Sequence, residues 1–312
     1  MSKLKGLLLT EGLHGMISQV EGLAKALDLD FFHEKVELNS FWNLIPPNLT
    51  PVSKFVFKNK IEKEFDIIIS CGRKSVIPSI YLKKKSNTKI INIHIQNPKV
   101  SIDNFDYIVS PEHDNLNGHN VINSKGAIHY LTLDEIKREK NYLESKLEKN
   151  KDIITLILGG PTNYYDYSNE NIIRIFSLVN KHLIEQNLQL ILIPSNRTPK
   201  ETITFAKEYF NKSRLIIDNV DKRAYLSSLA LSKYIVVTCD SSSMISEAAL
   251  TGKPIYVAMI PPRRNEKRFN KFRSLFKELN IIKELSEDLT SWNYESLNET
   301  YRVASIIKDK IK

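Results

Sequence analysis

The apolar residues of this chain occur in short runs separated by polar turns, and this pattern predicts a series of buried strands. The runs are rich in β-branched and aliphatic residues, as strands are when helices cover both faces of a parallel sheet. On this basis we expect strands at residues 5–9, 66–69, 89–95, 105–109, 153–158, 188–193, 215–217, 234–237 and 254–257.

Between these runs, apolar residues recur every three or four positions, which is the spacing of amphipathic helices. In residues 16–27, for example, Ile17, Val20 and Leu23 share one face. The same pattern predicts helices at residues 134–150, 171–186, 200–210, 224–231, 244–250 and 294–312, of which the first is strongly charged. Strands that alternate with helices indicate the α/β class.

The length of 312 residues exceeds what one hydrophobic core usually serves, so we expect two domains. Both halves repeat the alternation of strand and helix, which predicts two Rossmann-like parallel-sheet domains facing each other across a cleft. We place the first domain at residues 1–145 and the second at 146–290, with a C-terminal helix at 291–312 that returns to the first domain. This plan resembles that of GT-B-type glycosyltransferases.

The stretch from residue 234 to 257 has the pattern of strand, polar turn, helix and strand, and it carries the strongest sign of a ligand. The start of a helix presents unpaired N–H groups and a positive dipole end, which together suit a phosphate. The predicted helix start carries Ser241, Ser242, Ser243 and Met244. Glu247 lies about one helical turn further on and could accept hydrogen bonds from the two hydroxyls of a ribose. The alternative is a well-capped strand–helix–strand unit that binds nothing.

Other predicted strands also end in glycines or polar side chains. Because the carboxyl ends of parallel strands line the ligand crevice of an open α/β sheet, we expect these residues to share an edge. They are Gly12, His14, Gly15, Gly72, Arg73, Gln96, His113 and Asp114 in the first half, and Gly159, Gly160, Ser195, Arg197 and Thr198 in the second. Arg197 could pair with a diphosphate, since its planar guanidinium matches phosphate oxygens. His14 is either a base or a solvated loop histidine, and an ordinary polar loop is the alternative for each residue taken singly.

Residues 31–57 differ from the rest of the chain because they are rich in aromatic residues and are broken by prolines. Lys54, Lys58, Lys60 and Lys63 lie in this segment or just after it. Such a segment can dock at a lipid interface or pack as a loop on its own core, and the pattern favours packing.

Composition narrows the range of partners. The net charge of +9 comes mainly from lysines spread along the chain, with no arginine-rich stripe between aromatics, so we expect no nucleic-acid partner. Anionic nucleotides and anionic membrane surfaces suit this charge better.

Cys71 and Cys239 give neither a disulfide framework nor metal-ligand spacing, and we expect no metal site and no cofactor. Without an apolar run of membrane-spanning length or a signal-peptide pattern, we expect a cytoplasmic protein.

Taken in this order, the motifs resemble the mitochondrial-fission "elongated mitochondria" family, which has many bacterial members. The resemblance extends from Gly12 to Val257 and is most specific in its last motif. It is carried by Gly12-x-x-Gly15 with Gln19 and Gly22-Leu-Ala24, Gly72-Arg-Lys-Ser75, His94-Ile-Gln-Asn-Pro98, Phe105-Asp106 with Pro111-Glu-His-Asp114, Gly126-Ala127, Leu158-Gly-Gly160, Ser195-x-Arg-Thr-Pro199 and Val237-Thr-x-Asp-Ser-x-Ser-Met-x-Ser-Glu-Ala248.

The resemblance implies a GT-B fold, similar in plan to lipid-A-disaccharide synthase and to the peptidoglycan N-acetylglucosaminyltransferase. It implies that Ser241, Ser243 and Glu247 hold the phosphates and ribose of a nucleotide, helped by Gly159, Gly160, Arg197 and Thr198. It also implies that Gln96, His113 and Asp114 face the cleft from the first domain. Family members tend to carry a histidine directly after the second glycine of the N-terminal loop, where this chain has Met16. The expected base is therefore His113, next to Asp114, or His14.

These observations lead to one main hypothesis. We expect a metal-independent glycosyltransferase that moves a sugar from a nucleoside-diphosphate sugar to an acceptor hydroxyl, with an envelope glycolipid as the candidate acceptor and the inner face of a membrane as the place of action. Two alternatives stay open: a nucleoside-diphosphate-sugar epimerase on the same fold, and a non-catalytic membrane-associated scaffold.

Overall fold

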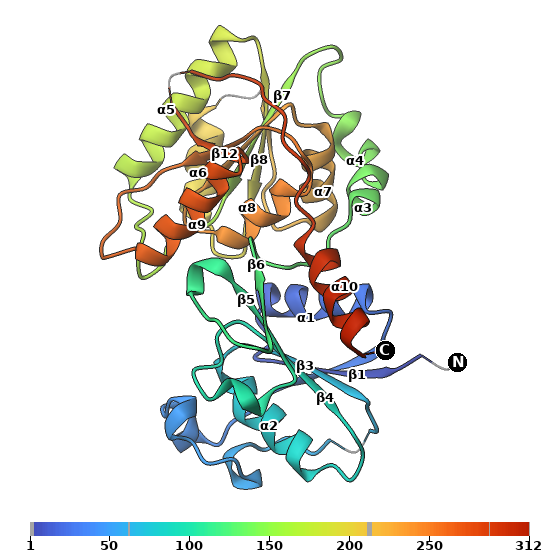
Figure 1. The fold of residues 1–312 in the computed structure, drawn as a ribbon. Coiled ribbons are helices and arrows are strands. Elements are labelled where there is room, and N and C mark those ends of the chain that lie inside the picture. Colours follow the sequence, from blue (N-terminus) through green and yellow to red (C-terminus); the bar gives the residue numbers. More distant parts are fainter. Residues whose placement is uncertain (1–2, 62, 211–213, 287, 312) are drawn as a thin grey trace. The chain divides into compact units, whose positions relative to one another are not determined.

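The protein folds into two compact α/β units, as a computed structural model describes for residues 3–61, 63–210, 214–286 and 288–311 (Figure 1). Unit 1 runs to Tyr130 and resumes at Asn298, and unit 2 is Leu131–Leu297. Each unit contains one six-stranded parallel sheet with helices. The predicted fold class, two Rossmann-like α/β domains, is confirmed.

Unit 1 is built on a sheet with the strand order β2-β1-β3-β4-β5-β6. Its strands are β1 (Lys5–Thr10), β2 (Asp30–Lys35), β3 (Ile67–Cys71), β4 (Ile91–Ile95), β5 (Tyr107–Pro111) and β6 (Val121–Ser124). Successive residues of β1 point to opposite faces, as the pleat of a strand requires. Leu8 packs in the hydrophobic cluster that contains residues of α1 (His14–Ala26) and α10 (Glu299–Ile311). Leu7 and Leu9 pack on the other face, with residues of α2 (Val76–Lys85).

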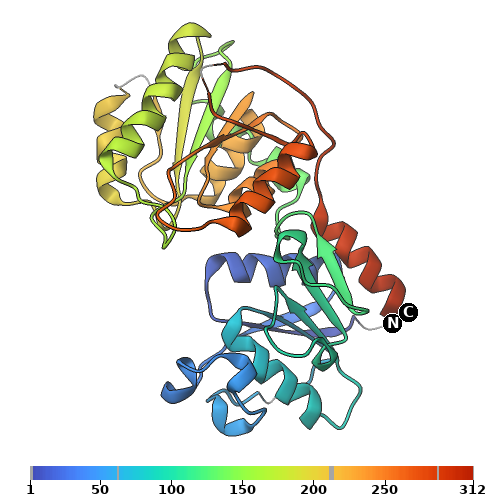
Figure 2. The same cartoon turned by 60° about the vertical axis from the view of Figure 1, so that its left-hand side comes forward.

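The C-terminal helix α10 completes the core of unit 1. It lies beside α1 although the two helices come from opposite ends of the sequence (Figures 1 and 2). Val303 and Ile307 are fully buried in the same cluster as Val20 and Leu23 of α1. Unit 1 therefore consists of two chain segments held together by apolar packing.

Unit 2 is built on a sheet with the strand order β12-β11-β10-β7-β8-β9. Its strands are β7 (Ile153–Leu158), β8 (Gln189–Pro194), β9 (Leu215–Ile216), β10 (Tyr234–Thr238), β11 (Ile255–Ala258) and β12 (Ile282–Glu284). Its helices are α3 (Leu133–Arg138), α4 (Asn141–Glu144), α5 (Asn169–Glu185), α6 (Lys200–Tyr209), α7 (Lys222–Leu231), α8 (Ser242–Ala249) and α9 (Lys267–Glu278). β7, β8 and β10 are buried along their whole length, because helices cover both faces of the sheet.

The structure differs from the sequence prediction in several elements. β2, β6, β12 and α9 were not predicted, and the charged helix expected at residues 134–150 is instead the two short helices α3 and α4. The last helix begins at Glu299 rather than at residue 294. The boundary expected after residue 145 differs from the observed division after Tyr130, because α3 and α4 pack against α7 of unit 2.

Residues 39–60, which we call the 39–60 loop, form an ordered projection from unit 1 with three single-turn 3-10 helices (Figure 1). Those turns are η1 (Ser40–Asn43), η2 (Pro47–Leu49) and η3 (Lys54–Val56). Val56 and Phe57 are buried in the core of unit 1, as the packing interpretation predicts. Phe41, Leu44 and other apolar side chains of the loop are instead exposed. Packing thus accounts for only part of this segment.

Among the described residues, no helix is both long and apolar enough to cross a membrane.

Candidate functional site

The strand order of unit 2 creates a topological switch point between β7 and β10. From β7 the chain proceeds to β8 on one side, and it later returns to place β10 on the other side. Loops that leave neighbouring strands in opposite directions open a crevice at the carboxyl edge of the sheet, where α/β proteins bind ligands. Gly159 and Gly160 follow β7 at this point, and Cys239 to Ser241 follow β10.

Asp240 is the centre of the hydrogen-bond network at this switch point. Its side chain is fully buried, and one oxygen accepts from the Gly160 backbone N–H at 3.1 Å and from Arg197 Nη2 at 2.8 Å. The other oxygen accepts from the Tyr167 hydroxyl at 2.7 Å. Burial and the neighbouring Asp240 charge raise the pKa of Tyr167 well above its usual value, so this hydroxyl remains a donor. The carboxylate thereby joins the loop after β7, the loop after β8 and the start of α8.

The two glycines after β7 allow this close approach. A Cβ at Gly159 would overlap the Asp240 carboxylate, and a Cβ at Gly160 would overlap the Arg197 carbonyl oxygen. The Gly159 backbone N–H also donates to Thr238 Oγ1 at 2.8 Å. Only glycine fits at either position without moving the neighbouring loop.

The loop after β8 is folded onto the same glycines. Ser195 Oγ donates to the Gly159 carbonyl at 2.9 Å, and Thr198 Oγ1 lies 2.6 Å from that carbonyl oxygen. Arg197 Nη1 donates to the Gly160 carbonyl at 3.1 Å. The Arg197 side chain is 41% exposed, so it presents a cation to solvent while its other contacts fix its direction. The structure thus brings together five of the predicted nucleotide residues, Gly159, Gly160, Ser195, Arg197 and Thr198.

The start of α8 stands at this edge of the sheet. Ser241 is the N-cap and accepts from the Met244 backbone N–H, while Ser242 and Ser243 form the first turn and are partly buried. The first turn contains no acidic side chain. An anion placed here would meet the positive end of the helix dipole and the Arg197 cation together.

Glu247 lies within α8 and accepts a hydrogen bond from the Tyr225 hydroxyl at 2.8 Å. Burial raises the pKa of its carboxyl to about 7, and the hydrogen bond from Tyr225 partly opposes this shift. The group therefore changes charge near neutral pH, which is unusual for a glutamate. One carboxyl oxygen is engaged by Tyr225, and Glu247 is only partly buried.

In unit 1 the corresponding switch point lies between β1 and β3. Gly12 and Gly72 both have positive φ there, at +85° and +93°. Gln19 accepts a hydrogen bond from the Cys71 thiol at 3.7 Å. A Cβ at Gly72 would lie 2.7 Å from the Met16 sulfur, so Met16 occupies the space beside this glycine.

His14 and Gly15 open α1, which begins two residues earlier than predicted. The His14 ring is exposed and contacts the Tyr130 ring edge-on, with ring centroids 6.3 Å apart. Arg73 is directed elsewhere: its guanidinium donates to the carbonyls of Asn43 and Ile45, at 2.5 and 3.1 Å. In this structure Arg73 holds the 39–60 loop, and its role toward a ligand stays a prediction.

Gln96, His113 and Asp114 follow β4 and β5, which are adjacent strands, so they belong to one edge of the sheet. Gln96 has a φ of +84° immediately after β4. His113 Nε2 lies 3.8 Å from Asp114 Oδ1, and both side chains are largely buried. His113 is thus the more enclosed of the two predicted bases, and His14 the more accessible.

Sequence reasoning missed Asp240, Tyr167 and Thr238 as site residues. The sequence gives Asp240 and Thr238 only as positions of the last resemblance motif, although an Asp that follows a buried strand at a switch point is itself a signal. Tyr167 gave no signal, because it lies in the connection between β7 and α5 and reaches Asp240 only through the fold. Strand order was needed to place these residues together.

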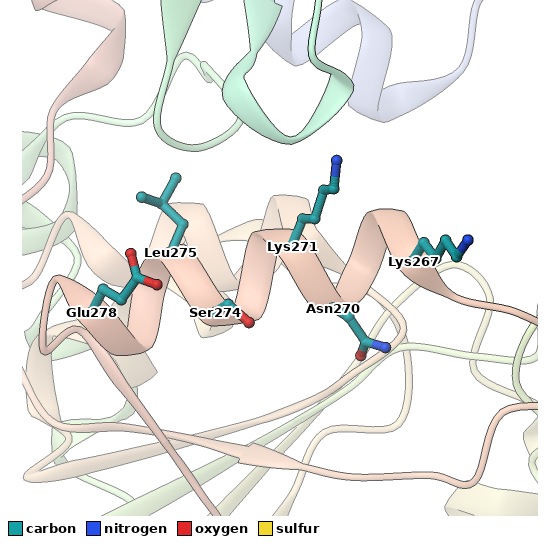
Figure 3. A pocket seen from close by; sticks show the side chains of 6 residues that line it. All are labelled: Lys267, Asn270, Lys271, Ser274, Leu275 and Glu278. Carbon is teal, nitrogen blue, oxygen red and sulfur yellow. The ribbon is translucent and has the colours of Figure 1, made fainter.

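Two further features bear on ligands. Among the described residues, no group of three or more His, Cys, Asp or Glu side chains is arranged to hold a metal ion. An open hollow lies along α9, and Figure 3 labels its lining residues: Lys267, Asn270, Lys271, Ser274, Leu275 and Glu278. No predicted nucleotide residue lines this hollow, so it is separate from the switch-point site.

Comparison with known families and proteins adds to this geometry. The sequence model of the family described as "Mitochondrial fission ELM1" matches residues 14–311. The uncharacterized protein RP120 of Rickettsia prowazekii is 30% identical over 286 residues, which cover 79% of this chain and 80% of that protein. The mitochondrial fission protein ELM1 of Arabidopsis thaliana is 24% identical over 275 residues, which cover 78% of this chain and 64% of that longer protein.

Among solved structures, the chain is similar in fold to UDP-GlcNAc 2-epimerase from Methanocaldococcus jannaschii. The TM-score is 0.55 over 98% of this chain and 100% of that one, and 14% of the residues are identical. At this identity the similarity establishes the fold, which is that of the GT-B-type sugar-nucleotide enzymes, and leaves activity and substrate open.

Proposed function

The chain belongs to the mitochondrial fission ELM1 family, and we propose that it is a GT-B-type glycosyltransferase that takes its sugar from a nucleoside-diphosphate sugar. The observation that carries the proposal is the switch point of unit 2. There the partly exposed Arg197 side chain and the first turn of α8 lie at one sheet edge, and Glu247 lies further along the same helix. The fold comparison supports a sugar nucleotide as ligand, since enzymes of this fold include a UDP-GlcNAc 2-epimerase.

In this proposal each group has a separate task in donor binding. The diphosphate lies at the start of α8, where the helix dipole, the hydroxyls of Ser242 and Ser243 and the Arg197 guanidinium stabilise its charge. The ribose hydroxyls donate to the free oxygen of the Glu247 carboxyl. Asp240 binds no ligand and instead holds Arg197 and the loop after β7 in position.

The transfer step needs a base and a stabilised leaving group. The acceptor oxygen forms a bond to the anomeric carbon of the sugar, and the bond from that carbon to the diphosphate oxygen breaks. The electron pair leaves with the diphosphate, where Arg197 and the α8 dipole stabilise it without a metal cation. His113, beside Asp114, takes the proton of the acceptor hydroxyl, with His14 as the second candidate.

The first test is direct binding of the nucleotide. The purified protein is screened against UDP, GDP, CDP and ADP by thermal shift and calorimetry. A ligand at about 100 times its dissociation constant stabilises the folded state by about 2.7 kcal/mol, which raises the melting temperature. We expect one of the four to bind clearly better than the others, and UDP is the first choice. No response to any of them, nor to their sugar conjugates, would remove the nucleotide site.

A pair of variants locates the site. Glu247→Ala is expected to weaken nucleotide binding by about 1–3 kcal/mol, the usual loss for hydrogen bonds to a charged group. Glu185→Ala, at an exposed position of α5, is the matched control and is expected to leave the affinity unchanged. Equal affinities for the two variants would show that Glu247 takes no part in binding.

The epimerase alternative is favoured by one observation, the fold similarity to a UDP-GlcNAc 2-epimerase. An epimerase needs no acceptor, so incubation of the protein with UDP-GlcNAc alone distinguishes the two reactions. Appearance of the C2 epimer by NMR would replace the transferase proposal. Unchanged sugar nucleotide, together with tight UDP binding, supports transfer.

We further propose that the protein acts in the cytoplasm at the inner face of a membrane, where an envelope glycolipid would present the acceptor hydroxyl. Transfer of radiolabelled sugar into an organic-extractable fraction of membranes tests this acceptor class. Unaltered transfer in excess EDTA is the expected result for a metal-independent enzyme, and loss of transfer in EDTA would show that a cation is needed.

A further inference from the structure

The 39–60 loop exposes an unusual concentration of large apolar side chains. Eleven large hydrophobic residues are strongly exposed among the described residues, and five of them lie between residues 41 and 55. They are Phe41, Leu44, Leu49, Val52 and Phe55. Leu44 is 83% exposed and Leu49 69%, so both point into solvent. Scattered surface apolar residues need no explanation, but a contiguous group of this kind marks an interaction surface.

Hydrogen bonds fix the conformation of the 39–60 loop, so its exposed apolar side chains belong to an ordered segment. Arg73 donates to the carbonyls of Asn43 and Ile45, at 2.5 and 3.1 Å. At the base, the Asn39 backbone N–H donates to the Val56 carbonyl at 2.9 Å, next to an antiparallel bridge between Leu38 and Phe57. An apolar surface that is already ordered loses little conformational entropy when it binds.

Aromatic residues stabilise the exposed surface internally. The Trp42 ring packs edge-on against Phe41, with centroids 4.9 Å apart, and lies 5.8 Å from the Phe55 ring. Trp42 is itself only partly buried. Tryptophan and phenylalanine side chains favour the boundary between the headgroups and the acyl chains of a lipid bilayer.

The charged residues of the 39–60 loop are all positive. Residues 39–60 contain no aspartate or glutamate and carry Lys54, Lys58 and Lys60, all exposed. Glu34 and Glu37 lie at the base, where the side chain of Asn59 contacts Glu34 and accepts from the Glu37 backbone. Lys54 lies over the ring of Phe57, with its Nζ 4.2 Å from the ring centroid, and Lys58 and Lys60 flank Asn59 near the base of the loop.

From this combination we propose that the 39–60 loop docks the protein on an anionic lipid bilayer, with its apolar side chains in the headgroup region and its lysines on lipid phosphates. A second copy of the chain suits the surface less well, since self-contact would bring lysines together. The inference deepens the proposed placement at a membrane and needs no transferase activity. Nucleotide binding in unit 2 is measured without lipid, so the two proposals fail separately.

The test uses the full-length protein and vesicles of phosphatidylcholine, with or without 30% phosphatidylglycerol, separated by flotation. We expect binding to the anionic vesicles at least about tenfold stronger than to neutral ones, and weaker in high salt, because lysines are attracted to an anionic lipid surface and salt screens this attraction. The triple variant Phe41→Ser, Leu44→Ser, Phe55→Ser should lose at least tenfold in vesicle affinity. The matched control Ile173→Ser, Ile184→Ser, Val220→Ser removes three exposed apolar residues of unit 2 and should bind as the wild type does.

Two further variants separate charge from apolar contact and report the position of the loop. Lys58→Gln with Lys60→Gln should weaken binding to anionic vesicles about tenfold, whereas Lys84→Gln with Lys85→Gln on α2 should not. The chain has two tryptophans, so Trp292→Phe leaves Trp42 as the only one. Its emission should shift to shorter wavelength when anionic vesicles are added.

Three results would overturn the proposal. The first is a wild-type protein that does not float with anionic vesicles. The second is an equal loss in the loop and control triple variants. The third is a stable dimer in ultracentrifugation that the loop variant abolishes, which would identify the loop as a contact between copies. Equal melting temperatures and equal UDP response of all variants serve as the check on folding.

Discussion

Asp240 illustrates at the scale of one residue how the switch point is held. Its buried carboxylate accepts from Gly160, Tyr167 and Arg197, so Asp240→Asn would place an amide donor against at least one of these donors. We expect a loss of about 1–3 kcal/mol in the free energy of unfolding, measured by urea denaturation. Asp218→Asn is the control, because Asp218 and its partner Lys207 are about half exposed and such pairs contribute about 0.2–1 kcal/mol. Equal stability of the two variants would mean that the network around Asp240 is not structural.

The raised pKa of Glu247 predicts how the stability of the protein depends on pH. Burial raises the pKa of its carboxyl from 4.5 to about 7, so the folded state binds the proton more tightly than the unfolded chain does. This contribution to stability is fully present below pH 4.5 and disappears as the pH rises through 7. Glu247→Gln is neutral at every pH. Between pH 5 and 8 the wild type should therefore lose about 2 kcal/mol of unfolding free energy relative to the variant. Parallel pH profiles of the two proteins would contradict the raised pKa.

The residue scale also shows what the sequence could and could not predict of the site. Three consecutive serines after a β-branched run were enough to place Ser241 at a helix start, because capping is a local interaction. The contacts of Asp240 with Tyr167 and Arg197 span 73 and 43 positions of sequence. Such contacts depend on the order of strands in the sheet, and the pattern of apolar and polar positions along the chain does not reveal that order. The same limit hid the contacts of Arg73 with backbone carbonyls of the 39–60 loop, while its predicted role toward a ligand stays a prediction.

At the scale of elements, strands buried on both faces were predictable, whereas the edge strands β2, β6 and β12 were not, and β9 was the one edge strand predicted. β3, β7 and β10 consist largely of β-branched and aliphatic residues, since helices cover both faces of each sheet. The polar residues among them, such as Ser70 and Thr155, are small and hydrogen-bonded. β2 has the sequence Asp-Phe-Phe-His-Glu-Lys and lies at the edge of its sheet, half exposed, so no apolar run marks it. The charged segment at 134–150 has helical composition, yet tertiary contacts with α7 divide it into two short helices.

Alanine substitutions at two glycines of α1 should change the stability of the protein in opposite directions. Gly15 is in the first turn with open space around it, whereas a Cβ at Gly22 would overlap the His129 carbonyl oxygen. That carbonyl is fixed, because it accepts from the Thr300 hydroxyl of α10 at 2.8 Å. Gly15→Ala should stabilise the protein by about 0.5 kcal/mol through helix propensity. Gly22→Ala should destabilise it by about 2–3 kcal/mol through overpacking. Urea denaturation measures both, and a neutral Gly22→Ala would mean that α1 is not packed tightly on residues 129–130.

For the whole molecule, the two units differ in how they depend on the chain termini. Unit 2 is the continuous segment Leu131–Leu297, whereas unit 1 needs α10 from the far end of the chain. Val303, Ala304 and Ile307 of α10 are buried in the core of unit 1. Deleting residues 298–312 should therefore remove at least about 3 kcal/mol of apolar burial from unit 1 and leave unit 2 intact.

Tryptophan fluorescence can measure the stability of each unit separately, because Trp42 lies in unit 1 and Trp292 in unit 2. With Trp292→Phe, urea denaturation follows unit 1, and the deletion should move its midpoint to lower urea. With Trp42→Phe, it follows unit 2, and the midpoint should stay where it is. Since the proposed nucleotide site lies wholly in unit 2, the same deletion should leave UDP affinity unchanged. Midpoints that shift together would show instead that the two units unfold as one cooperative body, and that the core closed by α10 also supports the site at the start of α8.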